Sequence, residues 1–129
     1  MRKIILLVSF VILLAGCAAP VLNIENEPIP NPSNARISVS DVEKAILTAS
    51  QERGWNARVI KPGLIEASIA VRTHRAAVEI PYSQNKYSIN YKSSENLDYE
   101  GGKIHRNYNN WIIRLSRDIN SELSAAARK

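Results

Sequence analysis

Residues 55–91 read WNARVIKPGLIEASIAVRTHRAAVEIPYSQNKYSINY and contain four runs in which apolar and polar residues alternate. Such alternation is typical of strands that have one buried face and one face in solvent. The residues expected on the buried face are Trp55, Ala57 and Val59; Ile65, Ala67, Ile69 and Val71; Ala76, Val78, Ile80 and Tyr82; and Tyr87, Ile89 and Tyr91. This stretch therefore predicts four strands of one sheet with a single apolar face.

The turns between these runs have lengths that keep the apolar faces together. A slip of one residue would turn every side chain of a strand to the other face, so turn length is a strict test of strand pairing. With a turn at Thr73-His74 in the second hairpin, the expected cross-strand pairs are Val59 with Ile65, Val71 with Ala76, and Tyr82 with Tyr87. All three turns have lengths that meet this requirement, and the sequence predicts a four-stranded antiparallel meander.

A helix is expected on each side of the meander. Ser40 and Glu43 fit a capping box, and Gly54 fits the position after a helix end, so residues 41–53 form the first predicted helix. Residues 106–126 form the second, because apolar residues recur there at spacings of three and four. The predicted fold is α+β, in the order α-β-β-β-β-α, with both helices packed on the apolar face of the sheet.

The polar face of the sheet is the first candidate binding surface. The expected register sets four polar side chains in one row and places Arg58 opposite Glu66 in the next row. The four residues of the row are Asn56, Ser68, Glu79 and Asn90. This face could bind a small polar ligand such as a glycan or a short peptide. The alternative is an ordinary solvated face, which antiparallel sheets commonly have.

The first seventeen residues form a pattern of their own. Arg2 and Lys3 precede an apolar run over residues 4–14 that is too short to span a bilayer permanently. The run ends in Leu14-Ala15-Gly16-Cys17, which matches a bacterial lipobox. We expect residues 1–16 to be a lipoprotein signal peptide and Cys17 to be the lipidated amino terminus, anchored in a membrane by its acyl chains. The alternative is an ordinary secretory signal with a chance cysteine.

Cleavage after residue 16 would leave 113 of the 129 residues, enough for one domain, expected over residues 37–129. Loss of Arg2 and Lys3 leaves 15 basic against 12 acidic residues, so the net charge falls from +5 to +3. That charge gives no reason to expect nucleic-acid binding. Because Cys17 is the only cysteine, no disulfide can form within the mature chain.

Residues 17–36 join the lipidation site to the predicted domain and contain four of the six prolines: Pro20, Pro28, Pro30 and Pro32. Proline is excluded from helix interiors and central strands. We expect an extended, mobile tether that holds the domain off the membrane. In the alternative, residues 21–24 dock on a partner or on the domain's own sheet edge.

Residues 96–111 form a second candidate surface, rich in Asn, Tyr and Trp, around the loop that contains Gly101-Gly102. Tyr99, His105 and Arg106 are the candidate interface residues there, because aromatic residues and arginine are enriched at protein interfaces. These positions could also meet lipid phosphates. Tyr108 and Trp111 fit the buried stripe of the second helix and are expected in the core.

No catalytic or metal-binding motif stands out. Zinc would need both histidines, His74 and His105, plus a carboxylate such as Glu66 or Glu79. A Ser-His-Asp triad is formally possible from Ser68 or Ser93, but neither serine has a nucleophile-elbow sequence around it. Glu66 and Glu79 could pair as in glycosidases, but two acids on a solvated face are common. The expectation is a protein without catalytic residues, metal or cofactor.

Several segments resemble a family of small proteobacterial outer-membrane lipoproteins that is, as a family, uncharacterised. They are KPGLI at 61–65, RTH at 72–74, IPYS at 80–83, YSINY at 87–91, NL at 96–97, IH at 104–105 and YNNWI at 108–112. The resemblance implies a location at the outer membrane and no active site. Ala18 after the lipobox cysteine, rather than Asp, fits outer-membrane sorting on the periplasmic side.

The expected role is therefore that of a non-enzymatic interaction or accessory module of the cell envelope. Its partner would be an envelope protein or peptidoglycan. The alternative role is a polar-ligand-binding domain that uses the open sheet face.

Overall fold

The computed structural model describes residues 18–30 and 37–128, so the predicted signal peptide and Cys17 lie outside the described residues. The helices are α1 (Val39–Glu52) and α2 (Arg106–Ala127). The strands are β1 (Ala18–Pro20), β2 (Ile24–Pro28), β3 (Asn56–Lys61), β4 (Leu64–Val71), β5 (His74–Pro81), β6 (Lys86–Glu95) and β7 (Lys103–His105).

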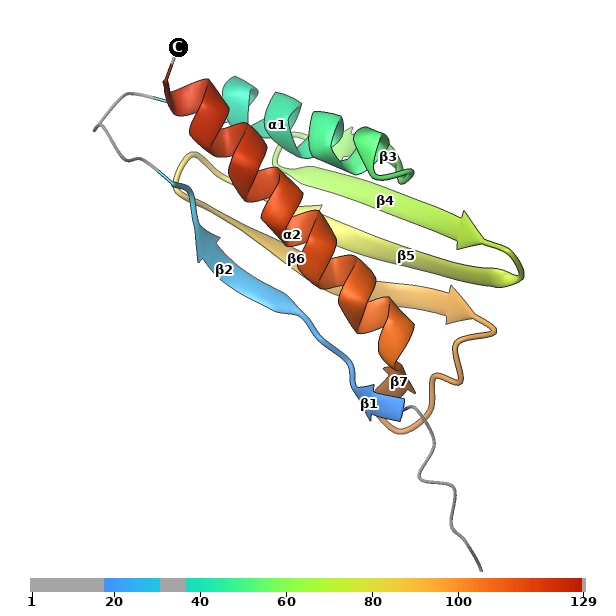
Figure 1. The fold of residues 1–129 in the computed structure, drawn as a ribbon. Coiled ribbons are helices and arrows are strands. Elements are labelled where there is room, and N and C mark those ends of the chain that lie inside the picture. Colours follow the sequence, from blue (N-terminus) through green and yellow to red (C-terminus); the bar gives the residue numbers. More distant parts are fainter. Residues whose placement is uncertain (1–17, 31–36, 129) are drawn as a thin grey trace, which may run out of the picture.

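The architecture is a sheet with two helices packed side by side on one of its faces, while the other face is open (Figure 1). Five antiparallel strands make the sheet, in the order β2-β6-β5-β4-β3, and β1 pairs with β7 in a small second sheet. The predicted α+β class is confirmed, with one helix before and one after the meander β3 to β6. The prediction of four strands is incomplete, because β2 adds a fifth strand along β6.

The register of the meander agrees with the sequence at two of its three turns. Val59 faces Ile65 and Tyr82 faces Tyr87, as expected. Val71 faces His74, however, and not Ala76. The chain reverses over two residues, Arg72 and Thr73, and Arg72 adopts the left-handed conformation (φ 56°) that tight hairpins require. Because the observed pairing differs from the predicted one by two residues, the apolar side chains of β4 and β5 still lie on the same face.

The start of α1 also differs from the prediction. The capping residue is Ser38, whose Oγ accepts a hydrogen bond from the Asp41 amide (3.0 Å) while the Asp41 carboxylate accepts one from the Ser38 amide (3.1 Å). The capping box predicted for Ser40 and Glu43 is therefore wrong, because the same pattern two residues earlier caps the start of the helix. The end at Gly54 is confirmed by its positive φ of 91°.

The core lies between the helices and the sheet, and most of the apolar residues that recur at spacings of three and four in α2 are buried in it. On α2, the fully buried residues are Tyr108, Ile112, Leu115, Ile119 and Leu123. Across from them Tyr87 is buried, and its hydroxyl contacts Ser116 Oγ (2.9 Å) and donates to Asn120 Oδ1 (2.8 Å). Burial raises the pKa of Tyr87 to about 12. Outside the core, Arg53 at the end of α1 pairs with Asp118 of α2 at 2.6 Å.

Residues 18–30 belong to the fold, which corrects the expectation of a mobile tether from residue 17 to 36. β1 pairs with β7, and β2 pairs with β6 along the sheet edge. Pro20 and Pro28 are each the last residue of their strand, at positions where edge strands accept proline. Docking on the domain's own sheet edge, the alternative for residues 21–24, is the arrangement observed, and residues 31–36 lie outside the described chain.

Candidate ligand-binding groove

The open face carries two rows of side chains, each running across β3, β4, β5 and β6. One row is Asn56, Ser68, Ala77 and Ser93, and the other is Arg58, Glu66, Glu79 and Asn90. The pairs Asn56–Ser68, Glu79–Asn90 and Arg58–Glu66 are those the sequence predicted. The single predicted row of Asn56, Ser68, Glu79 and Asn90 is wrong, because the register between β4 and β5 divides it into two.

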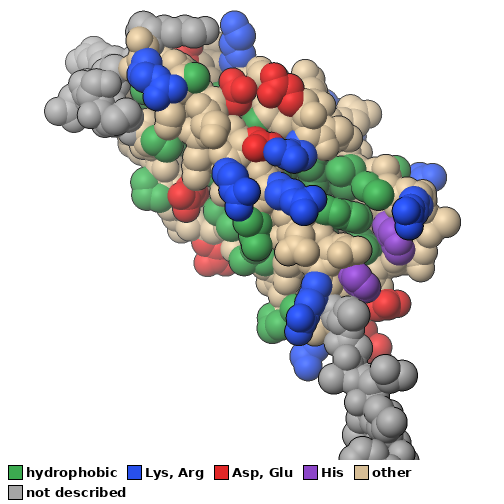
Figure 2. All heavy atoms as spheres, viewed as in Figure 1, with side chains coloured by type: hydrophobic (Ala, Val, Ile, Leu, Met, Phe, Trp, Pro, Cys, Tyr) green, Lys and Arg blue, Asp and Glu red, His purple; other side chains and the backbone are tan. Residues whose placement is uncertain are grey.

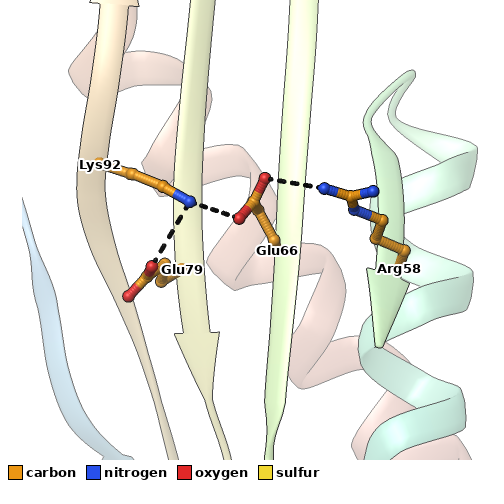
Figure 3. Close-up of polar contacts among 4 residues, drawn as sticks. All are labelled: Arg58, Glu66, Glu79 and Lys92. Atoms are coloured by element: carbon orange, nitrogen blue, oxygen red, sulfur yellow. Dashed lines mark hydrogen bonds and ion pairs between the residues drawn. The ribbon is translucent and has the colours of Figure 1, made fainter. Parts of the chain in front are cut away.

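The second row is held together by ion pairs (Figure 3). Glu66 and Glu79 are direct cross-strand partners, an arrangement in which two carboxylates repel each other. Lys92 lies between them, with its Nζ 2.5 Å from Glu66 Oε2 and 3.7 Å from Glu79 Oε1. On the other side, the Arg58 guanidinium lies 3.5 Å from Glu66 Oε1. These contacts define the charged row, Arg58, Glu66, Glu79 and Lys92.

A β-bulge brings Lys92 to this position. Ala77 faces Ser93 while Val78 faces Tyr91, so Lys92 is the extra residue on β6. The hydrogen bond from Lys92 lowers the pKa of Glu66, and the same bond raises the pKa of Lys92. Both groups are therefore held in their charged forms at neutral pH.

The first row forms the floor of a groove of about 530 Å³ beside the charged row. Its lining residues are Gly54, Asn56, Ser68, Ile69, Ala70, Arg75, Ala76, Ala77, Ser93, Ser94 and Glu95. Most are small, which leaves space above the sheet. Arg75 and Glu95 face each other at 3.9 Å and add charged groups at the end where β5 begins.

The chemistry of this groove is hydrogen bonding. The backbone of the strands beneath it is paired within the sheet, so side chains supply the contacts for a ligand. Asn56 offers an amide, and Ser68 and Ser93 offer hydroxyl groups, each on an exposed residue. The volume lies within the usual range of small-molecule sites, and the lining combines polar groups with small apolar ones.

The structure gives the two histidines contacts at loops and helix ends. His74 Nδ1 lies 2.6 Å from the Asn96 carbonyl oxygen, and His105 Nδ1 accepts a hydrogen bond from the Asn107 amide at the start of α2. Within residues 18–30 and 37–128, no three His, Cys, Asp or Glu side chains gather as a metal-ion cluster.

Glu66 and Glu79 are neighbours, as a glycosidase pair would be, but both carboxylates form ion pairs with Lys92. A general acid needs a carboxyl whose pKa is raised, whereas Lys92 lowers the pKa of Glu66. The pair is therefore suited to binding charges and holding the sheet together.

The candidate interface residues Tyr99, His105 and Arg106 lie apart from the groove. Tyr99 is 48% exposed and stacks on Tyr91, with ring centroids 4.4 Å apart. His105 ends β7 and Arg106 begins α2, beside β1. Of the two residues expected in the core, Tyr108 is fully buried and Trp111 is half-buried.

Sequence reasoning found Asn56 and Ser68 as lining residues but missed most of the others. Ala77 and Ser93 enter the row through the β4–β5 register and the β6 bulge, neither of which alternation reveals. The positive charge of Lys92 was visible in the sequence, but its place beside Glu66 and Glu79 depends on the same bulge.

Comparisons of this chain with protein-family models, with curated proteins and with solved structures gave no match. In the part of the chain that the structure describes, no helix is long and apolar enough to cross a membrane.

Proposed function

We propose that this protein is a lipoprotein anchored through Cys17 on the periplasmic side of the outer membrane, and that it acts by binding and not by catalysis. Its ligand would be a polar chain of the cell envelope, either a glycan or a short peptide such as those of peptidoglycan. The observation that carries this proposal is the groove on the open sheet face, with small residues on its floor and charged residues on both sides.

Three properties of the groove support binding of an extended polar ligand. It crosses several strands, so a chain laid over it would contact side chains from each of them. Its central residue, Ala77, projects little above the sheet. The charged groups beside it have both signs, which suits ligands that carry amine, carboxylate and hydroxyl groups together.

Titration with soluble muropeptides tests this function. We expect the NMR signals of the Asn56 side-chain amide and of the Ser68, Ala77 and Ser93 backbone amides to shift with saturation. Ala77→Trp should abolish the shifts by filling the groove, whereas Arg117→Trp, with the same bulky side chain on exposed α2 surface, should leave them unchanged. Absence of shifts at saturating muropeptide would contradict glycan or peptide binding of this kind.

A second candidate function, that of a protein adaptor, is favoured by the outer edge of β3. β3 is the last strand of the sheet, and among the described strands it pairs with β4 alone. Val59 and Ile60 on it are 40% and 45% exposed, and a partner strand could pair with this edge.

The two functions predict different crosslinks in native membranes. A photoreactive residue at position 60 should label a protein if the β3 edge binds a partner, and one at position 77 should label the groove ligand. Adducts at position 60 without any at position 77 would favour the adaptor function over the groove.

A further inference from the structure

The paired structure of this chain begins immediately after the proposed lipid anchor. Ala18, the residue that follows Cys17, pairs with His105, and Ala19 and Pro20 pair with Ile104 and Lys103. One peptide unit, about 3.8 Å between Cα atoms, thus separates the anchor residue from the fold. A free tether of about twenty residues would instead place the domain at an average distance of about 25 Å.

Further contacts hold this amino-terminal segment on the domain. The Val21 amide donates to the Gly102 carbonyl oxygen at 2.9 Å. The Asn109 side chain on α2 accepts from the Leu22 amide and donates to the Pro20 carbonyl oxygen, both at 2.9 Å. Together with β1 and β7, these contacts fix the direction in which the chain leaves the domain.

The residues around this end have the chemistry of a membrane–water interface. Tyr99 is about half exposed, and Lys103 and Arg106 are exposed on either side of Ile104 and His105. Figure 2 shows Lys and Arg side chains at the lower end of the molecule, near the start of the described chain. Aromatic and basic side chains are favoured at the level of lipid headgroups. Asp98 and Glu100 are also exposed there and balance the two cations.

We infer that the domain sits directly on the bilayer in one orientation, with its β1–β7 end against the lipid headgroups. This inference rests on the proposed lipidation of Cys17. Because acidic and basic side chains balance at this end, the short connection to the anchor sets the orientation, and zwitterionic lipids suffice. The residues that meet the headgroup region are Tyr99, Lys103 and Arg106.

The orientation places the rest of the molecule at defined heights. α2 starts at the β1–β7 end and, with 22 residues, rises about 33 Å away from it. The groove lies toward the membrane side, because its lining residue Glu95 is the last residue of β6. The loop that follows leads to β7, where the His105 amide donates to the Leu97 carbonyl oxygen at 2.8 Å. The turn at residues 83–86, at the other end of β6, faces away from the bilayer.

Paramagnetic relaxation enhancement tests this arrangement with the full lipidated protein. The probe is a phosphatidylcholine nanodisc that contains a lipid with a gadolinium-chelating headgroup. We expect strong broadening of the amide signals of residues 97–106 and little or none at residues 61, 63, 83–86 and 122–127. Replacing phosphatidylcholine in part by phosphatidylglycerol should leave this gradient unchanged.

A matched variant separates the connection from the anchor. Insertion of about twenty Gly and Ser residues between Cys17 and Ala18 keeps the domain and the lipid but frees the domain to tumble. We expect the gradient to collapse in this variant. An equal gradient in both proteins would show that the short connection does not set the orientation and would overturn the inference.

Mass spectrometry of the purified protein distinguishes failure of the inference from failure of the proposed anchor. An acylated Cys17 together with uniform broadening overturns the fixed orientation and leaves the anchor standing. A Cys17 without acyl groups overturns the anchor and the orientation together.

Discussion

Lys92 joins two acidic residues on the open face of the sheet. The sheet register makes Glu66 and Glu79 direct neighbours, and the ammonium group of Lys92 lies between their carboxylates. Because its bond to Glu66 lowers the pKa of that carboxyl, folding is favoured at pH values above the ordinary Glu value of 4.5. This contribution disappears as the pH falls through the lowered pKa.

The same bond raises the pKa of Lys92 above its ordinary value of 10.5. The stabilisation on this side is complete below 10.5 and is lost as the pH rises through the raised pKa. The ion pair therefore stabilises the fold between about pH 4.5 and 10.5, where both groups are charged.

Replacing Lys92 with Met tests this account. We expect the pKa of Glu66 to rise, because its nearest cation is gone and Glu79 remains opposite. The melting temperature at pH 7 should fall, and mild acidification toward pH 5 should lower it less than in the unmodified protein, because protonation now relieves repulsion. Carboxyl ¹³C NMR titration and thermal unfolding at several pH values measure both effects.

Lys86→Met, which removes a lysine from the other end of the same strand, is the matched control. It should leave the Glu66 titration unchanged. A Glu66 pKa that is the same in Lys92→Met and in the unmodified protein would contradict the ion-pair account.

At the scale of elements, the start of α1 shows how two similar patterns compete. Ser38 and Ser40 both precede an acidic residue at capping distance, and the structure uses Ser38 with Asp41. Glu43, the acid of the rejected box, accepts a hydrogen bond from the Tyr82 hydroxyl and so links α1 to the end of β5.

Two serine variants measure this choice. Ser38→Ala should lower the free energy of unfolding by about 1 kcal/mol, because a side-chain acceptor is lost at the helix start. Ser40→Ala, inside the first turn, should change it by less than about 0.5 kcal/mol. Urea unfolding gives both values, and an equal loss in the two variants would contradict the assigned cap.

Alternation along the chain predicts the face of the sheet on which a side chain lies, although Val59 and Val71 are 40% and 38% exposed there. It determines strand pairing only up to an even shift. Ile69 and Val71 lie on the same face, so pairing Ala76 with either of them satisfies the hydrophobic pattern. The left-handed Arg72 decides between them, and arginine is not a residue that marks such a turn. The same ambiguity affects the groove. The place of Asn56 and Ser68 on the open face could be predicted, whereas the positions of Ala77, Ser93 and Lys92 could not.

β2 was predicted only as an alternative, the docking of residues 21–24 on a sheet edge, for a related reason. Its sequence, IENEP, has one clear apolar residue and ends in proline, so it lacks the alternation of a strand. β2 is held at the edge of the sheet by its pairing with β6 and by contacts such as the hydrogen bond from the Asn26 backbone amide to Ser88 Oγ. Contacts distant in sequence supply what the local pattern lacks.

At the scale of the whole molecule, the described domain starts at Ala18 and not at residue 37. Val21, Leu22 and Ile24 pack against the core, and Ile29 is part of it. The amino-terminal strands therefore complete the fold by covering the edge of β6 and a side of α2.

A chain that starts at Ile37 should show the cost of removing them. Without β2, the long strand β6 presents an open edge, which favours aggregation. We expect a lower melting temperature and larger species in analytical ultracentrifugation. A chain that starts at Ala18 is the control and should match the mature protein in both measurements. Equal behaviour of the two shortened chains would show that β1 and β2 are dispensable.

The pairing of Ala18 with His105 also bears on the order of events during biogenesis. Enzymes that modify and cleave at a lipobox need the residues around the cysteine as an accessible extended chain, yet the first of these residues after Cys17 lies in β1. If Cys17 is acylated, as proposed, β1 must stay undocked until processing is complete. Closure of β1 onto β7 would then be the last step of folding, and it would take place at the membrane surface.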